Sequence, residues 1–453
     1  YPVTPTKYNI VVVLTDDLSD DLVRYMPAVK RLQEDGVRFS RYIVSNSLCC
    51  PSRTSIFTGR LPHNTQVRTN LPPFGGYEQF ITAGNAYSTF GTSLAADGYR
   101  VALFGKSLNG YKAYRDPPFP GFSDWAATAS GYRQVDYTLN VDGVPVQYGH
   151  SRSEFLNRVL ENKGRRFIRT SAAAGQPFML EISSFSPHAP FAYEREDADR
   201  YPYVLAPRGS AFGQANRNPP AWLAGHPPFT QAQRERLDRN YRKRIRSVLS
   251  VNRLLLGLRK EVRASGVADR TFVIFSSDNG FHVGQHRLLL GKQTAFDHDI
   301  RVPLVAAGPG IPPGSVTSVL AQNTDLRPTF EALGGLTPSA DVDGMNLIPW
   351  MQNPALGGGR PFALIEHKRE TRKTRADPDV QNYKQGDPPD YDALRLPDAT
   401  YVEYVTGERE YYDLVTDPDE LDNVYATLPD EYKAQLAAKL AQLRTCTGQE
   451  CNG

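Results

Sequence analysis

Cysteine, long apolar runs and net charge are all scarce in this 453-residue sequence. No run approaches the roughly 20 apolar residues that a membrane-spanning helix needs, and the strongest, residues 10–14, has the length of a strand. The formal net charge of +3 is too small to favour nucleic acid as a partner, although it leaves room for a locally basic pocket. We therefore expect neither a membrane span nor nucleic acid as a partner.

The cysteines number only four and form two local pairs, Cys49 with Cys50 and Cys446 with Cys451. The second pair flanks a short polar loop, and we expect it to form a small disulfide. A disulfide favours an oxidising compartment. The chain begins at Tyr1 without a charged-then-apolar leader, so we expect that a signal peptide has been removed. These features predict a secreted or periplasmic protein.

The composition is that of an ordinary globular protein, with 40% apolar and 22% charged residues. Buried-strand patterns alternate with helical patterns along the chain. We expect strands at residues 8–14, 37–44, 100–104, 178–185, 271–275 and 301–307, and helices at 26–35, 90–96, 155–168 and 229–264. This order predicts an α/β fold with a large, mixed but mostly parallel sheet between helices, in which ligands gather at the carboxyl ends of the strands.

The alternation of buried strands and helices ends after residue 345. Residues 362–366 and 401–404 resemble antiparallel strands, 431–443 a terminal helix, and 368–390 a long, charged, Pro-rich loop. We therefore expect a large domain at 1–345 and a smaller α+β domain with an antiparallel sheet at 346–453.

Two acidic or amide pairs follow predicted strands. Asp16 and Asp17 end the first strand, and Asp278 and Asn279 follow the strand at 271–275. Adjacent buried carboxylates repel each other unless a cation or a proton compensates. Hard oxygen ligands suit calcium or magnesium, although residues 16–21 also fit an acidic helix start. Taken together, the two pairs predict a calcium site.

The segment from Cys49 to Arg60 matches C-x-P-S-R-x-x-x-x-T-G-R. It resembles the signature of the sulfatase family, in which the first Cys is converted to formylglycine. The resemblance extends from Asn9 to about Asn423 and implies an alkaline-phosphatase-like fold. The Leu108-Asn109 pair stands where many arylsulfatases have a His, and resembles the N-acetylglucosamine-6-sulfatase branch.

The resemblance implies a set of site residues. Asp16, Asp17, Asp278 and Asn279 match the family's metal ligands, with the formylglycine made from Cys49 as a further ligand. Lys106, His188 and Lys292 match its sulfate-binding lysines and its strand-end histidine. We expect Asn109 and His282 to contact substrate in the region of the absent second histidine.

The mechanism that the resemblance implies begins with a hydrated formylglycine at position 49. One hydroxyl attacks sulfur, and the other later expels sulfate as the aldehyde re-forms. Calcium, or magnesium, would hold the diol and a sulfate oxygen. Arg53, Lys106 and Lys292 would face the charge that builds on the sulfuryl oxygens, and His188 would protonate the leaving oxygen. A formylglycine-generating enzyme is then an obligatory partner during maturation.

The substrate is expected to be a sulfated amino sugar or glycan of the N-acetylglucosamine-6-sulfate type, or else an aryl sulfate. The basic run at residues 368–375 either reaches over the pocket toward a polyanionic glycan or is a solvated loop. Two alternatives remain: a phosphate or phosphonate monoester hydrolase of the same superfamily, and a non-catalytic glycan-binding protein.

Overall fold

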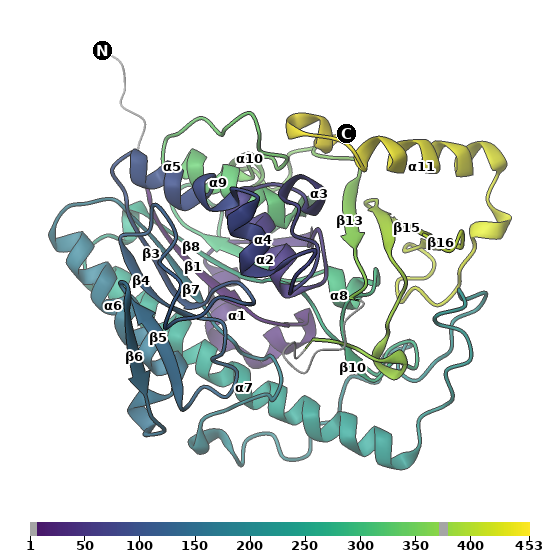
Figure 1. Cartoon of the computed structure of the whole chain (residues 1–453), viewed down its shortest axis with the longest axis horizontal. Helices are drawn as coiled ribbons and strands as arrows, with labels where there is room; N and C mark the ends of the chain where they lie inside the picture. The colour runs from purple at the N-terminus through teal and green to yellow at the C-terminus, as the bar shows by residue number, and fades with distance from the viewer. Residues whose placement is uncertain (1–6, 371–378) are drawn as a thin grey trace.

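The computed structural model describes residues 7–370 and 379–453, and its centre is a large twisted sheet (Figure 1). Among these residues ten strands form the sheet, in the order β12-β2-β11-β8-β1-β7-β3-β4-β5-β6. In chain order the strands are β1 (Asn9–Thr15), β2 (Val37–Ile43), β3 (Arg100–Lys106), β4 (Asp124–Thr128), β5 (Tyr137–Val141), β6 (Val144–Tyr148), β7 (Phe178–Ser183), β8 (Thr271–Ser277), β11 (Leu304–Ala307) and β12 (Ser315–Gln322).

Strand β1 shows why the sheet is buried on both faces. Its side chains alternate between two hydrophobic clusters: Ile10, Val12 and Leu14 enter one, and Val11 and Val13 enter the other. Because successive side chains of a strand point to opposite faces, a continuous apolar run needs cover on both sides. The predicted fold class is confirmed in this central region, where β1, β3, β7 and β8 are parallel.

Helices supply the cover on both faces (Figure 1). The cluster containing Ile10 is completed by α2 (Cys49–Thr58), α4 (Gly76–Thr82), α5 (Phe90–Ala96), α9 (Leu326–Leu333) and α10 (Ile348–Gln352). The opposite cluster is completed by α1 (Pro27–Glu34), α6 (Leu156–Ala173) and α7 (Gln231–Ala264). Two four-residue helices, α3 (Pro62–Thr65) and α8 (Asp297–Ile300), lie in the connections.

Antiparallel strands make the sheet mixed. Strand β11 runs antiparallel to both β2 and β8, and β5 and β6 extend the other edge as a hairpin beside β4. The sequence patterns did not predict β4, β5, β6 or β12. These strands lie toward the sheet edges, and β6 in particular is largely solvent-facing, so its hydrophobic pattern is weak.

The C-terminal part contains a four-stranded antiparallel sheet of β13 (Ala363–His367), β14 (Tyr391–Arg395), β15 (Ala399–Tyr404) and β16 (Arg409–Asp413). Helix α11 (Asp430–Leu443) packs on it, and the predicted Cys446–Cys451 disulfide is present. Its Ile365 and Ala393 join the same hydrophobic cluster as β1. Because the core runs through both parts, the domain division at residue 345 stays a prediction.

The parallel strands place several polar segments at one edge of the sheet. Strands β1 and β8 end beside each other, with Thr15 opposite Ser277, so the residues that follow them are neighbours. Strands β3 and β7 end at the same edge, where Lys106 closes β3 and His188 follows β7. Within the described residues, no helix combines the length and the apolar character that crossing a bilayer requires.

Candidate active site at the carboxyl edge of the sheet

Helix α2 carries the signature segment and begins at Cys49. All ten of its residues are buried, although many of them are small and polar. Pro51 lies in the first turn, where its missing N–H removes no intrahelical hydrogen bond. Gly59 ends the helix with φ +66°, and a Cβ there would lie 2.7 Å from Val342 Cγ1. The helix is therefore enclosed along its length and closely packed where it ends. Its N-terminus, the positive end of the helix dipole, lies at Cys49.

Cys49 lies among charged groups although its side chain is fully buried. Its Sγ is 2.9 Å from Lys292 Nζ, 3.3 Å from Asp16 Oδ1 and 3.5 Å from Asp379 Oδ2. Burial, together with the nearby carboxylates of Asp16 and Asp379, raises the pKa of the thiol well above its ordinary value, against the opposing effect of the two lysines Lys106 and Lys292. As a thiol, this group is a poor nucleophile near neutral pH.

Asp16 and Asp17, which follow β1, are paired with buried lysines. Lys106 Nζ donates to Asp16 Oδ2 at 2.6 Å, and Lys292 Nζ donates to Asp17 Oδ1 at 2.7 Å. Burial lowers the pKa of each lysine, but the carboxylates outweigh it and the net shift is well upward. Both lysines therefore remain cations inside the protein.

Asp278 and Asn279, at the end of β8, complete the acidic group. The Asn279 amide donates to Asp17 Oδ1 at 2.7 Å, while its Oδ1 is buried and has no hydrogen-bond partner among residues 7–370 and 379–453. A buried amide oxygen without a partner is costly unless a ligand meets it. Ligand atoms of Asp16, Asp17 and Cys49 also lie within 4.8 Å of one another, in a group of side chains that could hold a metal ion. The donor set is rich in oxygen and fits a hard divalent cation.

Arg53, one turn after Cys49 on α2, reaches the same group. Its Nε donates to Asp278 Oδ2 at 2.8 Å, and its Nη1 donates to Ser183 Oγ. Burial would lower the pKa of the guanidinium, but Asp278 and Asp16 outweigh this effect, so the pKa is raised above its ordinary value. Arg53 is thus a permanent buried cation beside the predicted metal ligands.

His188 lies on the turn after β7, with both ring nitrogens engaged. Its Nδ1 lies 2.7 Å from the Ala189 carbonyl and its Nε2 lies 2.8 Å from Asp379 Oδ1. Burial would lower its pKa, but the carboxylates of Asp17 and Asp379 outweigh this effect and raise it to about 9. Since both neighbours are acceptors, the ring is a doubly protonated imidazolium at neutral pH.

Asp379 and Asn70 also belong to this group, and the sequence patterns did not single them out. Asp379 Oδ1 lies 3.0 Å from Lys292 Nζ, and Oδ2 accepts a 2.8 Å hydrogen bond from Asn70 Nδ2. The Asn70 Oδ1 accepts from the Cys50 N–H at the start of α2. Neither residue lies in a motif or at the end of a predicted strand, so only the folded chain brings them to Cys49.

The two predicted substrate contacts, Asn109 and His282, differ in their surroundings. Asn109 is buried and its Oδ1 has no hydrogen-bond partner in the described part of the chain. The ring of His282 instead lies between Asp299, at 3.0 Å from Nδ1, and the Gln385 carbonyl, at 2.7 Å from Nε2. Asn109 thus has an unsatisfied acceptor, whereas both nitrogens of His282 are engaged within the protein.

The arrangement has a counterpart among known proteins. The family model described as Sulfatase matches residues 8–336. The chain belongs to the sulfatase family. N-acetylglucosamine-6-sulfatase of Homo sapiens is 31% identical over an alignment of 478 positions, gaps included, that covers 98% of this chain and 85% of that protein. The predicted family is confirmed, and the protein is an enzyme of the sulfatase class.

Solved structures with the same fold include proteins named for different substrates. A protein solved with its substrate D-glucosamine-2-N,6-O-disulfate superposes with a TM-score of 0.79 at 18% identity, covering 97% of each chain. The phosphonate monoester hydrolase of Agrobacterium radiobacter superposes with a TM-score of 0.71 at 24% identity, covering 97% of this chain and 95% of that one. At these identities the comparison establishes the alkaline-phosphatase-like fold alone.

The basic run predicted at residues 368–375 is described only at its start in this sulfatase. Lys368 pairs with Asp390 and Arg369 pairs with Asp387, each at 2.5 Å. These two cations are therefore compensated by acidic neighbours. Residues 371–375 lie outside the described residues, so the predicted contact of the run with a glycan stays a prediction.

Proposed function

We propose that this sulfatase hydrolyses sulfate monoesters of amino sugars, with a nucleophile made by converting Cys49 to formylglycine. The observation that carries the proposal is the surroundings of Cys49. A thiol whose pKa is raised by burial and by Asp16 and Asp379 is unsuited to attack, yet it lies at a helix N-terminus facing Lys292. Conversion to an aldehyde, which hydrates to a diol, supplies a hydroxyl nucleophile at the same position.

A divalent cation fits the oxygen-rich side of the site. Asp16, Asp17, Asp278 and Asn279 would hold it together with the converted side chain of Cys49, and calcium is the ion we expect, with magnesium as the alternative. The unsatisfied buried Asn279 Oδ1 supports this assignment. When bound, such an ion lowers the pKa of a hydroxyl ligand and neutralises charge on the sulfate.

Three donors already converge on an anionic group in this site. The carboxylate of Asp379 is bound by His188, Lys292 and Asn70, and it carries one negative charge, as a sulfate monoester does. These donors are therefore suited to sulfate oxygens. With Arg53 and Lys106 they would hold the sulfate and stabilise the charge that grows on it during transfer.

His188 is positioned to handle the proton. Its protonated Nε2 points to the anion position now filled by Asp379, and its Nδ1 is held by the Ala189 carbonyl. Donation of this proton to the ester oxygen would let a sugar hydroxyl leave as a neutral alcohol. This step matters most for alkyl sulfates, whose alkoxides are poor leaving groups.

The relatives and Asn109 support this substrate class. The human relative is named for the 6-sulfate of N-acetylglucosamine, and a fold neighbour was solved with a glucosamine disulfate. Asn109, with its unsatisfied Oδ1, would accept a hydrogen bond from a sugar hydroxyl or amide. A second candidate, phosphonate or phosphate monoester hydrolysis, is supported by the similar fold of a phosphonate monoester hydrolase.

Two measurements test the proposal. Peptide mass spectrometry should find the Cys49 peptide about 18 Da lighter than the thiol form, with its hydrate, in protein from a host that can convert it. The same protein should release sulfate from glucosamine 6-sulfate faster than phosphate from the matching phosphate ester. An unmodified thiol combined with no sulfate release would refute the mechanism, and a faster phosphate or phosphonate reaction would favour the second candidate.

The location outside the cytoplasm is also a proposal. The Cys446–Cys451 disulfide closes the C-terminal turn against α11 and supports folding in an oxidising compartment. Mass spectrometry of protein purified without reductant from the culture medium or periplasm should find this pair oxidised. A reduced pair in protein confined to the cytoplasm would contradict the proposal.

A further inference from the structure

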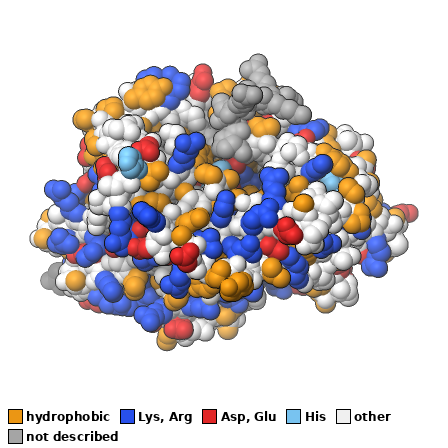
Figure 2. Space-filling view, turned by 90° about the horizontal axis from the view of Figure 1, so that it is seen from below, with side chains coloured by type: hydrophobic (Ala, Val, Ile, Leu, Met, Phe, Trp, Pro, Cys, Tyr) orange, Lys and Arg blue, Asp and Glu red, His pale blue; other side chains and the backbone are white. Residues whose placement is uncertain are grey.

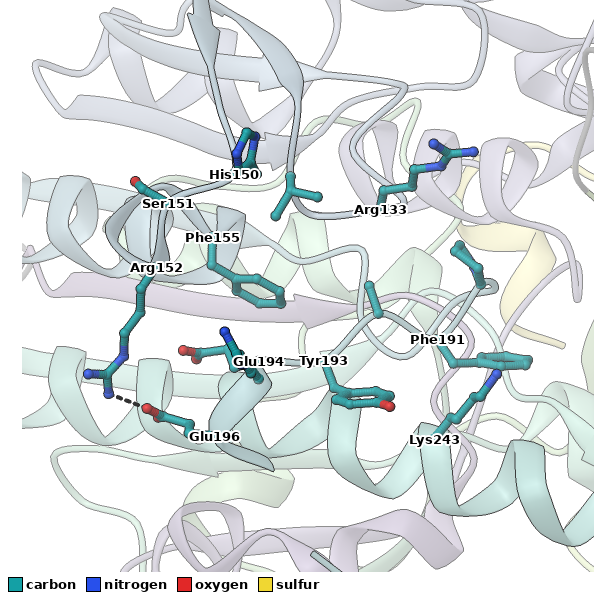
Figure 3. Close-up of a pocket in the computed structure, with 14 residues that line it drawn as sticks. Arg133, His150, Ser151, Arg152, Phe155, Phe191, Tyr193, Glu194, Glu196 and Lys243 are labelled. Carbon is teal, nitrogen blue, oxygen red and sulfur yellow. Dashed lines mark hydrogen bonds and ion pairs between the residues drawn. The ribbon is translucent and has the colours of Figure 1, made fainter. Parts of the chain in front are cut away.

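Pro190 and Phe191, which follow His188 in the chain, line a pocket of about 850 Å³. Figure 3 shows this pocket. Four separate segments line it: residues 133–135, residues 150–155, residues 190–196, and Lys243 on α7. The volume falls within the roughly 300–1,000 Å³ of small-molecule sites and is large enough for a sugar ring. None of the catalytic residues proposed above lines this pocket.

The pocket carries cations that have no ion pair within the described residues. Arg133, Arg195 and Lys243 are all exposed at its rim, and no acidic group of residues 7–370 or 379–453 lies within ion-pair distance of them. Arg152, in contrast, pairs with Glu196 across the left side of Figure 3. Three unpaired cations around one hollow favour an anionic ligand.

Aromatic rings supply the remaining wall. Phe155, Phe191 and Tyr193 all line the pocket, and Figure 3 shows Phe155 and Tyr193 in the middle of the view and Phe191 beside Lys243. A concave site with aromatic walls and a few charged groups is the usual composition of a small-molecule site. The combination suits a sugar ring, which has apolar C–H faces and carries its charge at the periphery.

The pocket shares a wall with the catalytic turn. Pro190 and Phe191 line it, and the Phe191 N–H donates to the His188 carbonyl at 2.9 Å. On the other side Arg133 follows Tyr132, whose ring lies 4.5 Å from the His188 ring. A chain of sugars with one residue at His188 would therefore have its neighbour close to this pocket.

We propose that this pocket binds a second, acidic sugar of the glycan, next to the sugar that loses sulfate. The inference rests on the proposed function, because it assigns a second binding position to the same substrate. Arg133, Arg195 and Lys243 bind the sulfate or carboxylate of that sugar, and the aromatic rings pack on its faces. Figure 2 shows Lys and Arg side chains gathered over the underside of the molecule, which α7 crosses, and this field attracts a polyanionic chain.

The test compares two substrates in the full-length, converted enzyme. One is glucosamine 6-sulfate, and the other is a heparin-derived tetrasaccharide that carries this sugar at its non-reducing end. The wild type should have the higher kcat/KM on the tetrasaccharide. Arg133→Ala and Lys243→Ala should each lower the tetrasaccharide-to-monosaccharide ratio about 5-fold, and the double variant about 25-fold, through KM.

Lys260→Ala is the matched control. Lys260 is also an exposed lysine on α7 without an ion pair among the described residues, and it lies 17 positions after Lys243, about 25 Å along the helix. Its removal should leave the ratio unchanged. If Lys243→Ala and Lys260→Ala lowered this ratio equally, Lys243 would act only through general surface charge, and the proposal that the pocket binds a second sugar would be overturned. A wild-type ratio near one would also overturn it.

A binding measurement separates this inference from the proposed function. Full-length Cys49→Ala protein, which has no nucleophile, is titrated with the tetrasaccharide by calorimetry. Binding weakened about 5-fold by Arg133→Ala or Lys243→Ala supports the pocket even where no sulfate ester is hydrolysed. Binding that neither variant changes overturns it even where glucosamine 6-sulfate is a good substrate.

Discussion

Replacing Lys106 by Met should destabilise the protein most strongly when no divalent cation is present. The Lys106 side chain is fully buried, and its Nζ is 2.6 Å from Asp16 Oδ2. Breaking a buried ion pair by removing one partner leaves an uncompensated charge and costs about 3–5 kcal/mol. Burial and volume are nearly preserved by Met, so the loss of charge dominates the change in the free energy of unfolding.

The corresponding shift in melting temperature can be worked out from the length of the chain. An unfolding entropy of about 2.1 cal/mol/K per residue gives about 1 kcal/mol/K for 453 residues. The variant should therefore melt about 3–5 °C below the wild type in chelator. A divalent cation at Asp16 would replace part of the lost positive charge, so added calcium should narrow the gap.

Differential scanning calorimetry of both proteins, with chelator and with calcium, measures the effect. Lys260→Met, an exposed lysine on α7 without an ion pair among the described residues, should melt within about 1 °C of the wild type. A Lys106→Met shift no larger than that of the control would refute the buried ion pair. A gap that calcium leaves unchanged would refute Asp16 as a metal ligand.

Three further outcomes are expected. Because the pKa of His188 is raised to about 9, its protonated form persists through neutral pH and is lost above about pH 9, so kcat on a sugar sulfate should fall there. His188→Gln should lower kcat on that substrate about 10²–10⁴-fold, and by less on an aryl sulfate with a good leaving group. Asp379→Asn removes the anion bound to His188, so inhibition by free sulfate, measured as Ki, should tighten about 10-fold; an unchanged Ki would contradict Asp379 as an occupant of the anion position. The double variant Cys446→Ser, Cys451→Ser opens a loop of sequence separation 5 and should lower the free energy of unfolding by about 2 kcal/mol, or the melting temperature by about 2 °C. Reductant should lower the melting temperature of the wild type but not that of the variant.

Local patterns in the sequence were enough to predict the central strands. The continuous apolar run that became β1 predicts a strand covered on both faces, and the two hydrophobic clusters on either side of it are that cover. The residue types in the segment from Cys49 to Arg60 were likewise sufficient to indicate the family. Asp16 and Asp278 were expected to be neighbours because adjacent parallel strands end at one edge.

Only the tertiary structure decided which other groups surround Cys49. Asn70 and Asp379 lie 309 positions apart in the chain, and their hydrogen bond depends on how two irregular connections pack over the sheet edge. No periodicity encodes such a contact, because loops are not constrained by a repeating pattern of hydrogen bonds. The same holds for the pocket of Arg133, Phe191 and Lys243, whose walls come from segments far apart in the sequence that are brought together by the packing of α7 against the sheet. The sequence thus determined the central strands and the chemistry of its motifs, while long-range packing determined which charges surround those motifs.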